Sequence, residues 1–424
     1  MEPQTRLGTA LLTKFAYGGV DLTAFREELS VLCQHRATRA GALMDLSTID
    51  QLQGDLHGGL ARQAEALEIC AAYRTHGHPN APLTLLVFAA PIHMGGNTPV
   101  EFLLPGKGVT IITLYLPHDP ADDATLTLPA HDVAFCAAPA DAADAHKTFD
   151  RVRALSQASD APVLNLPARL IKPERDRLPA LLGAVPGLRL PKTVSVDRAD
   201  LCAALQDGWE AAFLHGAGPY PYVVRPAGSH AGQGLQKITS RADFLDYLDA
   251  REEPTFFVSE FINYAGPGDG LFRKYRVILV DGVPYPCHMA ISDHWDVWYM
   301  NADMSGSAAK RAEEAAFMAG FADDFAPRHA RAFEALYQSL GLDYVGVDCA
   351  EDAEGNLVVF EADNALIVHD MDCTETFPYK TAPMQQIFAA FARMLRTKCD
   401  APSTTTLHQV PPLHADPRQT AAFG

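Results

Sequence analysis

The spacing of hydrophobic and polar residues changes along the chain and divides it into segments. From residue 20 to about 76, apolar residues recur at helical spacing, and this predicts helices over about 40–53 and 57–74. From about 80 to 166, short apolar runs alternate with a helical stretch. This second pattern is typical of a mainly parallel sheet that is covered on both faces.

The second segment contains four predicted strands and one predicted helix. The strands cover 83–90, 109–116, 133–137 and 163–166, and the helix covers 142–158. After the first strand comes a turn, Gly95–Pro99, in which Thr98 can cap a helix that starts at Pro99. Such a turn either binds an anion, such as a substrate carboxylate, or is only structural. Its spacing is not that of a dinucleotide-binding fingerprint.

Residues 167–400 form a third block of strands and helices that holds most of the candidate chemistry. Residues 401–424 are rich in Pro, Thr, Ala and His and have no periodicity, so we expect a poorly ordered tail. The predicted organisation is therefore a helical segment 1–78, an α/β domain 79–166, a larger domain 167–400 and the tail.

Length, charge and cysteine content indicate a globular protein of several domains and argue against nucleic-acid-binding, membrane and disulfide-rich proteins. With 424 residues, of which 48% are hydrophobic, the chain can build two or three cores. A net charge of −18 without long basic runs argues against a nucleic-acid surface. No apolar run approaches the ~18–20 residues of a membrane span, and the first residues lack a signal-peptide layout. Eight scattered cysteines without a CxxC pair favour reduced thiols over disulfides or a zinc site. We expect a cytoplasmic protein without membrane contact.

Three carboxylates near the C-terminus form the most informative motif. Residues 344–349 and 357–361 are predicted to be the strands of a hairpin, with Asp348 on the first strand. Glu361 and Asp363 are two residues apart, so both leave the same face of the second strand. Converging oxygen ligands of this kind suit Mg²⁺, although solvated acids beside a turn are the alternative.

A glycine-rich loop follows another predicted strand. The strand ends in Arg225, and the loop from Gly228 to Gly234 contains Ser229, Gly232 and Gln233. Glycines allow backbone N–H groups to approach phosphate oxygens, and the arginine supplies positive charge. A flexible hairpin without a ligand is also typically rich in glycine.

A third segment contains an apolar strand that leaves through Glu260, Phe261 and Ile262, and then a basic strand that contains Arg276. The first could present backbone groups to a purine edge. Arg276 could neutralise a phosphoryl group during its transfer, unless it belongs only to an exposed basic strand edge.

Taken in order, these motifs resemble the ATP-grasp superfamily. The cation with its glycine loop, the Ser-Glu-Phe-Ile hinge, the arginine strand, the Gly-Val-Asp strand and the Phe-Glu-Ala-Asp-Asn strand are similar to the branch of RimK-type ligases, glutathione synthetases and D-alanine–D-alanine ligases. The resemblance covers roughly residues 167–400, with a Rossmann-like pre-ATP-grasp domain before it. The helical N-terminus looks like one tetratricopeptide-like helix pair.

The resemblance implies roles for individual residues. Arg225 stands where the family usually has its second ATP-binding lysine, and Arg177 resembles an earlier phosphate-contacting cation. The residues that the resemblance assigns to the nucleotide are Arg177, Arg225, Gly228, Ser229, Gly232, Gln233, Gly234, Glu260, Phe261 and Ile262. Arg276 matches the arginine that contacts the transferred phosphate, and Asp348, Glu361 and Asp363 match the metal ligands. The implied lid subdomain covers about 192–262.

The sequence departs from the family pattern at three places. The last metal position is usually Asn and is Asp363 here, while Asn364 comes one residue later. The acid that often holds the ribose is replaced by Tyr275, and Asp269 could take its place. Arginine at 225 keeps the charge but changes the hydrogen-bond geometry.

The implied reaction is an ATP-dependent ligation of a carboxylate to an amine through an acyl phosphate, with ATP and Mg²⁺ as cofactors. One or two metal ions could bind, and Mn²⁺ could substitute. The expected substrates are small molecules, such as amino acids or a short peptide, and dimers are common in the family. A phosphotransferase on the same fold and a non-catalytic nucleotide-binding scaffold are the alternatives.

Between the arginine strand and the metal strand lies a segment that faces the substrate in the family. His288, His294 and Asn301 are its candidates for substrate contact or for removal of the amine proton, and His369 is a weaker one. Structural histidines are the alternative. Arg276, His294 and Asn301 are the catalytic residues that we predict.

Overall fold

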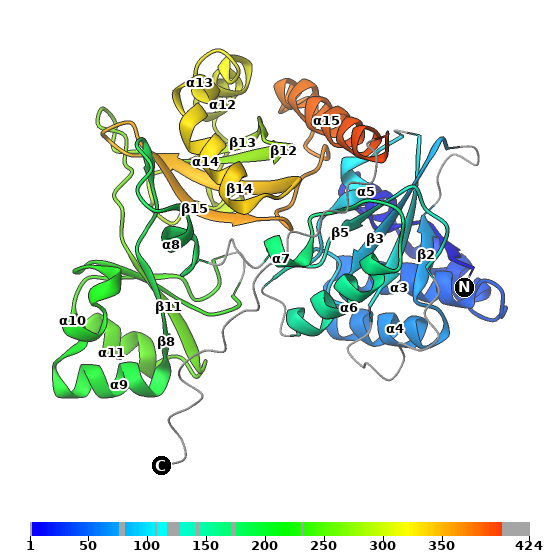
Figure 1. Ribbon diagram of the computed structural model, residues 1–424, viewed down its shortest axis with the longest axis horizontal. Helices are drawn as coiled ribbons and strands as arrows, with labels where there is room; N and C mark the ends of the chain where they lie inside the picture. The colour runs from blue at the N-terminus through cyan, green and yellow to red at the C-terminus, as the bar shows by residue number, and fades with distance from the viewer. Residues whose placement is uncertain are drawn as a thin grey trace.

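The computed structural model describes residues 2–75, 81–106, 108–116, 128–140, 144–170, 175–229 and 232–400. The described residues form three sheets with helices packed on them (Figure 1), which confirms the predicted α/β class. The predicted tail 401–424 lies outside the described residues. Within the described ranges, no helix is both long and apolar enough to cross a membrane. All eight cysteines lie in these ranges and are free thiols.

The first sheet has six strands. Their spatial order is β1 (Gln4–Arg6), β2 (Ala72–Thr75), β4 (Val109–Tyr115), β3 (Leu83–Ala89), β5 (Val133–Cys136) and β6 (Val163–Leu164). All neighbouring strands are parallel except β2 and β4, which are antiparallel.

Helices cover both faces of this sheet, and this explains why its strands are continuous apolar runs. Leu86 and Phe88 share a core with α6 (Ala145–Gln157) on one face. Leu85 and Val87 share a second core with two helices on the other face, α5 (Val100–Leu103) and α15 (Thr381–Asp400).

Four helices precede the main strands of the first sheet, and they are not a separate unit. They are α1 (Thr9–Tyr17), α2 (Thr23–Leu32), α3 (Arg39–Leu52) and α4 (Leu56–Ile69). Strand β1 comes before them and pairs with β2, so the boundary predicted near residue 78 falls between two strands of one sheet. The predicted helix 57–74 is wrong at its end, because Ala72 and Tyr73 are buried in β2 on opposite faces of the sheet. The tetratricopeptide likeness of α3 and α4 stays a prediction.

The second sheet is antiparallel and has a core of its own. Its spatial order is β10 (Gln236–Ile238), β9 (Tyr222–Pro226), β11 (Thr255–Glu260) and β8 (Thr193–Asp197). The helices with it are α9 (Arg198–Asp207), α10 (Glu210–Phe213), η2 (His215–Ala217) and α11 (Arg241–Asp249). Helix α11 begins with a capping box in which Ser240 and Asp243 satisfy each other's backbone N–H groups.

The third sheet carries the predicted metal and phosphate residues. Its spatial order is β13 (Val283–Ser292), β12 (Phe272–Val280), β14 (Tyr344–Glu351), β15 (Leu357–Asp363) and β7 (Leu188–Arg189). The remaining helices are α7 (Pro167–Leu170), α8 (Leu178–Leu182), η3 (Tyr299–Asn301), α12 (Ala308–Gly320), α13 (Phe325–Arg328), α14 (Ala330–Leu340) and η4 (Pro378–Lys380).

Helix α15 and Asn165 join the first sheet to the third. Phe391 of α15 contacts Phe135 of β5 and Tyr344 of β14 at ring distances of 5.6 and 5.4 Å. Asn165 is fully buried; its amide oxygen accepts the N–H groups of Asp343 and Tyr344, and its amide nitrogen donates to the Tyr344 carbonyl. These contacts fix the position of β14, and therefore of Asp348, relative to the N-terminal domain.

Candidate active site

The predicted acidic hairpin is formed by β14 and β15. Asp348 lies opposite Glu361 in the antiparallel register, and Asp363 lies opposite Gly346. The register shifts directly after Asp348, at an irregularity between Asp348 and Cys349. The two strands therefore bring all three carboxylate residues to the same end of the hairpin.

Two cations of the neighbouring strand β12 hold Asp348. Nε and Nη2 of Arg276 donate to its two carboxylate oxygens at 2.7 and 3.0 Å, and Nζ of Lys274 lies 2.7 Å from Oδ2. Burial alone would raise the pKa of Asp348, but Arg276 and Lys274 together hold it well below its usual value. Asp348 is therefore ionised although only 2% of its side chain is exposed.

Lys274 was missed from the sequence, although a signal was present. Lys274 and Arg276 are two residues apart on one strand, so they leave the same face. The period of two predicts that both cations leave one face of the strand, and in the structure Asp348 pairs with Arg276 in the register.

The other two carboxylates have different partners. Glu361 receives a hydrogen bond from Nη2 of Arg175, whose Nη1 also donates to the Phe360 carbonyl at 3.1 Å. Oδ1 of Asp363 accepts the N–H of Ala365 at 2.9 Å. In the part of the chain that the structure describes, no group of three or more His, Cys, Asp or Glu side chains is arranged to hold a metal ion. Carboxylate oxygens suit Mg²⁺ in kind, so the metal role of the three acids stays a proposal.

Asn364 does not replace the family's usual asparagine ligand. It is 2% exposed, and its amide nitrogen donates to Oγ1 of Thr98 at 2.9 Å and to the carbonyls of Ala137 and Ala138 at 3.3 Å each. Its side chain thus points away from Glu361 and ties the end of β15 to the first sheet.

The predicted anion-binding turn differs from the expectation. Helix α5 has only four residues, its N-cap is Pro99, and Oγ1 of Thr98 donates to the Ala137 carbonyl instead of capping the helix. The turn is instead held by helices α3 and α4, since Gln51 accepts the N–H of Met94 at 2.8 Å and Gln63 donates to the Ile92 carbonyl at 3.0 Å.

The glycine loop is described on both sides of residues 230 and 231. Nε of Arg225 donates to Oγ of Ser229 at 3.1 Å, and Ser229 in turn donates to the Pro226 carbonyl at 2.8 Å. At Gly234, φ is +67° and an added Cβ would lie 2.6 Å from the Pro226 ring, so a larger residue would strain the loop. Gly228, Gly232 and Gln233 are solvent-exposed, as a phosphate-covering loop requires.

The predicted adenine hinge has less hydrogen-bonding capacity than expected. The N–H of Glu260 donates to the backbone carbonyl of Lys192 at 2.8 Å, and the N–H of Phe261 donates to the backbone carbonyl of Pro221 at 3.2 Å. Because these donors are used inside the protein, the hinge prediction depends on the carbonyl groups and on Ile262. Arg189 pairs with the Glu260 carboxylate at 2.9 Å and thereby links the second sheet to the third.

Two further cations lie near these residues. Nζ of Lys237 is 3.5 Å from the centre of the Phe261 ring, a cation–π contact that the sequence did not predict. Arg177 is exposed at the N-cap of α8, whereas its neighbour Arg175 reaches Glu361. Of the two arginines, Arg175 is therefore closer to the predicted metal ligands.

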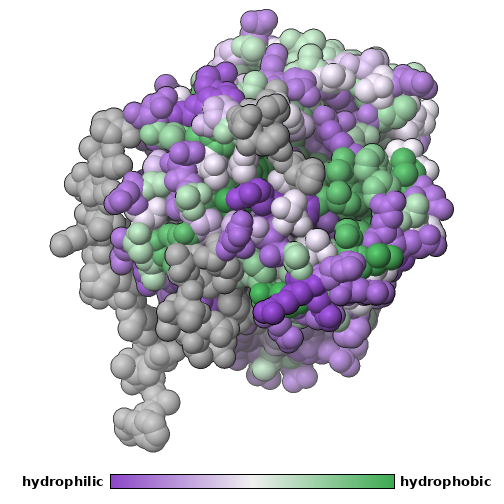
Figure 2. Space-filling view, turned by 90° about the vertical axis from the view of Figure 1, so that its right-hand side faces the viewer, coloured by the Kyte–Doolittle hydropathy of each residue, from purple (hydrophilic) through white to green (hydrophobic). Residues whose placement is uncertain are grey.

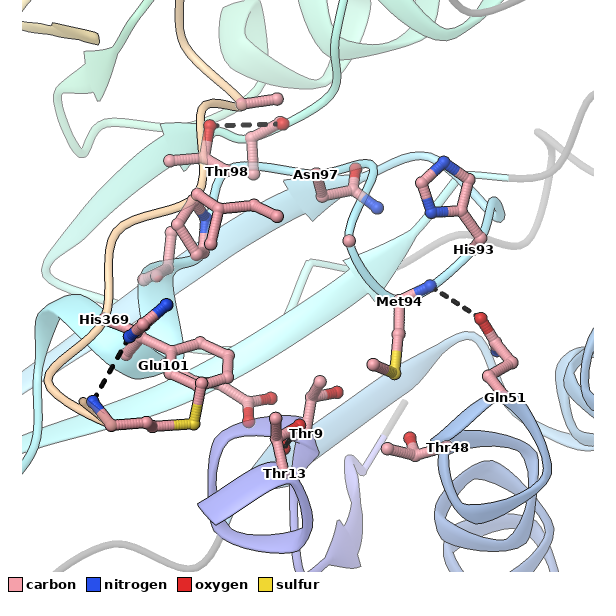
Figure 3. A pocket seen from close by; sticks show the side chains of 18 of the residues that line it. Thr9, Thr13, Thr48, Gln51, His93, Met94, Asn97, Thr98, Glu101 and His369 are labelled. Carbon is pink, nitrogen blue, oxygen red and sulfur yellow. Dashed lines mark hydrogen bonds between the residues drawn. The ribbon is translucent and has the colours of Figure 1, made fainter. Parts of the chain in front are cut away.

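A cavity of about 680 Å³ lies beside Arg276, between the N-terminal domain and the third sheet. Its wall on the side of the third sheet includes Arg276, His288, Tyr299, His369 and Lys380. Figure 3 shows the opposite walls, where residues of α1, α3 and the turn after β3 surround the open space.

His294 and Asn301 do not line this cavity. The His294 side chain is 77% exposed beside Asp293, and Asn301 closes the short η3 turn by accepting the N–H of Trp298 at 2.9 Å. His288, which the sequence also offered, is opposite Arg276 in the register and does line the cavity. Burial first, and then Arg276 and Lys380, hold the pKa of His288 well below its usual value, so this imidazole is neutral near pH 7.

A buried polar network supports the same wall of the cavity. Nζ of Lys380 lies 2.9 Å from Asp372 and 3.4 Å from Glu314, and it also donates to the Tyr299 hydroxyl. Burial raises the pKa of Glu314 despite the nearby Lys380, and Tyr379 donates to this carboxyl at 2.6 Å. No local sequence pattern marks Lys380, because its partners come from segments 8 to 81 residues away.

Comparison with known proteins gave matches only to solved structures. No protein-family model matches the sequence, and no curated protein matches it significantly. The fold is similar to a RimK domain ATP-grasp protein from Sphaerobacter thermophilus, with 15% identity over 74% of this chain and 99% of that one and a TM-score of 0.42. It is also similar to D-alanine–D-alanine ligase from Bacillus anthracis complexed with ATP, with 13% identity over 75% of this chain and 96% of that one and a TM-score of 0.44. VanG D-Ala:D-Ser ligase from Enterococcus faecalis is similar with 12% identity over 74% of this chain and 98% of that one and a TM-score of 0.40.

Proposed function

We propose that the protein is an ATP-dependent ligase that joins a carboxylate to an amine through an acyl phosphate. The observation that carries this proposal is the position of Arg276. Its guanidinium group holds Asp348 of the predicted metal hairpin, and the same side chain lines the 680 Å³ cavity. A predicted phosphate-binding cation thus stands at the wall of a space that is large enough for an organic substrate.

In the proposed reaction, an oxygen of the substrate carboxylate attacks the γ-phosphorus of ATP, and the bond to ADP breaks. Arg276 offsets the negative charge of the transferred phosphoryl group. The amine then attacks the acyl carbon, inorganic phosphate leaves, and the amine loses a proton. In this proposal His288 accepts that proton, because it lines the cavity and its imidazole is neutral near pH 7.

ATP would lie against the glycine loop and the third sheet, with Arg225 and Lys237 as its cations. Asp348, Glu361 and Asp363 would hold Mg²⁺, which would neutralise phosphate charge when it is bound. We include His288 among the catalytic residues in preference to His294 and Asn301, since the cavity wall contains His288.

The test is ADP release from ATP and Mg²⁺ with pooled carboxylic acids, with hydroxylamine as a general amine. A ligase should release ADP only with an acid present, and mass spectrometry should find the acid's hydroxamate. A stable phosphorylated product without hydroxamate would instead indicate a phosphotransferase. Nucleotide binding without turnover in any pool would indicate a scaffold.

Two arginines of β12 provide matched variants for this assay. Arg276→Met should abolish ADP release, because the transferred charge loses its partner. Arg273→Met should keep it, since Arg273 leaves the other face of the strand and pairs with Asp269 and Glu313. Equal activity of the two variants would contradict the role of Arg276.

A further inference from the structure

The 680 Å³ cavity is lined by two chemically different groups of side chains. Arg276, His288 and Lys380 line it from the third sheet and the segment that follows, beside the predicted phosphate site. The N-terminal segment supplies another part of the lining, because its helices α1 and α3 contribute Thr13, Thr48 and other side chains (Figure 3). The N-terminal segment is therefore part of the binding site itself.

The wall made by α1 and α3 presents hydrogen-bond acceptors. Thr13 donates its hydroxyl proton to the Thr9 carbonyl at 2.7 Å, and Thr48 donates to the Met44 carbonyl at 3.3 Å. A hydroxyl has one proton to donate and two lone pairs, so each oxygen retains the capacity to accept. These hydroxyls best complement N–H or O–H groups of a bound molecule.

Apolar side chains also contribute to the lining, among them Met44, Ile92 and Met94, together with polar ones such as Gln51 and Glu101. At the mouth stand large hydrophobic side chains that are unusually exposed: Tyr17 (68%), Trp298 (49%), Met300 (72%) and Ile367 (55%). Figure 2 shows hydrophobic patches on the face of the molecule that is seen from the right of Figure 1, among mostly polar residues.

We propose that the cavity binds a carboxylic acid of dipeptide size or larger, which has an apolar body and carries hydrogen-bond donors at the end remote from the reacting carboxylate. This proposal rests on the proposed function for the reacting end. The carboxylate lies near Arg276, the apolar body lies along Met44 and Met94, and the donors face Thr13 and Thr48. A single amino acid would leave most of the 680 Å³ empty, since cavities of about 300–1,000 Å³ hold drug-sized ligands.

The experiment compares acids of graded size in the assay with ATP and hydroxylamine. The panel contains single amino acids, dipeptides, N-acetyl dipeptides, and phenylalkanoic acids of dipeptide length that lack donors. We expect the highest kcat/KM for the dipeptides and N-acetyl dipeptides. A preference for single amino acids, or for the phenylalkanoic acids over dipeptides of equal length, would overturn the proposal.

One variant of the wall and one matched control examine the proposed donor contact. Thr48→Val keeps the shape and removes the acceptor, so KM for a dipeptide should rise about fivefold, the effect of one neutral hydrogen bond, with kcat unchanged. KM for the phenylalkanoic acid should stay the same. Thr148→Val is the matched control and should leave KM for both acids as in the unmodified protein. Thr148 is also a buried helical threonine, but it lies on α6, outside the cavity.

Equal effects of Thr48→Val on KM for both acids would overturn the proposed donor contact.

Calorimetric binding of the same acids separates this proposal from the proposed function. One outcome is that no acid supports ADP release, that dipeptides nevertheless bind, and that Thr48→Phe, which fills the cavity, prevents their binding. In that case the cavity assignment stands and the ligase assignment fails. If ADP is released with single amino acids and Thr48→Phe has no effect on their binding, the ligase assignment stands and this proposal fails.

Discussion

At the residue scale, the candidate site contains a buried cluster of charges around Asp348. Arg276 and Lys274 share one buried carboxylate, so this cluster has one positive charge in excess. A cluster of this kind attracts a further anion, because burial weakens solvent screening. The phosphate groups of ATP or the carboxylate of a substrate would provide that anion in the proposed reaction.

Glu361 and Asp363 should differ in their importance for turnover. Glu361→Ala should abolish ADP release, because it removes one of the proposed metal ligands and leaves Arg175 without its carboxylate. Asp363→Asn should retain activity with a changed dependence on Mg²⁺ concentration, because the amide oxygen still ligates but carries no charge.

Titration of ADP release against Mg²⁺ measures both effects. The Glu361–Arg175 pair is partly exposed, at 25% and 23% of the side chains, so its loss should cost at most about 1 kcal/mol and leave the protein folded. Circular dichroism provides that control. A fully active Glu361→Ala protein would show that the acids belong to a solvated turn.

Protonation of the cavity histidines should lower stability at acidic pH. The folded-state pKa of His288 is well below 6.5, and that of His369 is also lowered, chiefly by burial. The unfolded chain then binds more protons than the folded one, so stability should fall as pH decreases below about 6.5, by up to about 1.4 kcal/mol per pH unit for each such histidine.

Urea denaturation between pH 7 and 5.5 measures this loss. His288→Gln should show a smaller loss than the unmodified protein, because one of the two titrating groups is gone. The control is His57→Gln, which makes the same substitution on the exposed surface of α4. An unchanged slope in His288→Gln would mean that His288 is protonated in the folded protein.

Sequence spacing predicted the residues whose roles depend on local geometry. Asp348, Glu361 and Arg276 could be named as candidates because alternation along strands determines the direction of side chains and because their motifs resemble a known family, and their roles stay predictions. Arg175 and Lys380 were not found, since their partners are distant in the sequence and no period relates them. His294 was preferred over His288 because sequence alone does not distinguish an exposed histidine from a buried one.

At the scale of elements, the end of β15 and the turn after β3 depend on each other. Asn364 joins them through its bonds to Thr98, Ala137 and Ala138, and Gln51 of α3 holds the same turn at Met94. The predicted metal strand and the wall of the cavity are thereby connected through one buried amide. This connection keeps Glu361 and Asp363 at a fixed distance from the cavity.

Asn364→Ala should destabilise the protein by about 2 kcal/mol. The substitution leaves the Thr98 hydroxyl oxygen and two buried carbonyl groups without this donor, and unsatisfied buried groups cost about 1–3 kcal/mol. Urea denaturation measures the change. Asn263→Ala, an exposed site, is the control and should change stability by less than about 0.5 kcal/mol. Equal stability of the two variants would contradict the role of Asn364.

Strands made of continuous apolar runs were predictable, and a strand without such a run was not. The runs of β3, β4 and β14 are recognisable because strands that are buried on both faces are mostly apolar. Strand β1 has three residues, of which only Arg6 is buried, and such a segment gives no periodic signal. It forms because the backbone of β2 offers an unpaired edge and because Arg6 has a buried partner.

For the whole molecule, the N-terminal segment decides whether the cavity exists. Helices α1 and α3 form one of its walls, and β1 extends the first sheet. Arg6 of β1 forms an ion pair with Glu101 of α5 at 2.6 Å, with 3% and 14% of the two side chains exposed. Burial opposes the charge on Arg6, but Glu101 raises the pKa of Arg6 above its usual value, so Arg6 stays ionised.

Arg6→Met should therefore destabilise the first sheet as a whole, by about 3 kcal/mol, because it leaves the Glu101 carboxylate in a mostly buried position without a cation. Arg39→Met is the matched control. It breaks an ion pair with Glu65 in which both side chains are more than 40% exposed, and exposed pairs contribute less than about 1 kcal/mol. If the N-terminal segment were an independent helical array, Arg6→Met would unfold that segment alone and leave the main urea transition unchanged. A shift of the main transition, with weaker binding of acids in the cavity, would instead show that residues 2–69 fold and function together with the rest of the chain.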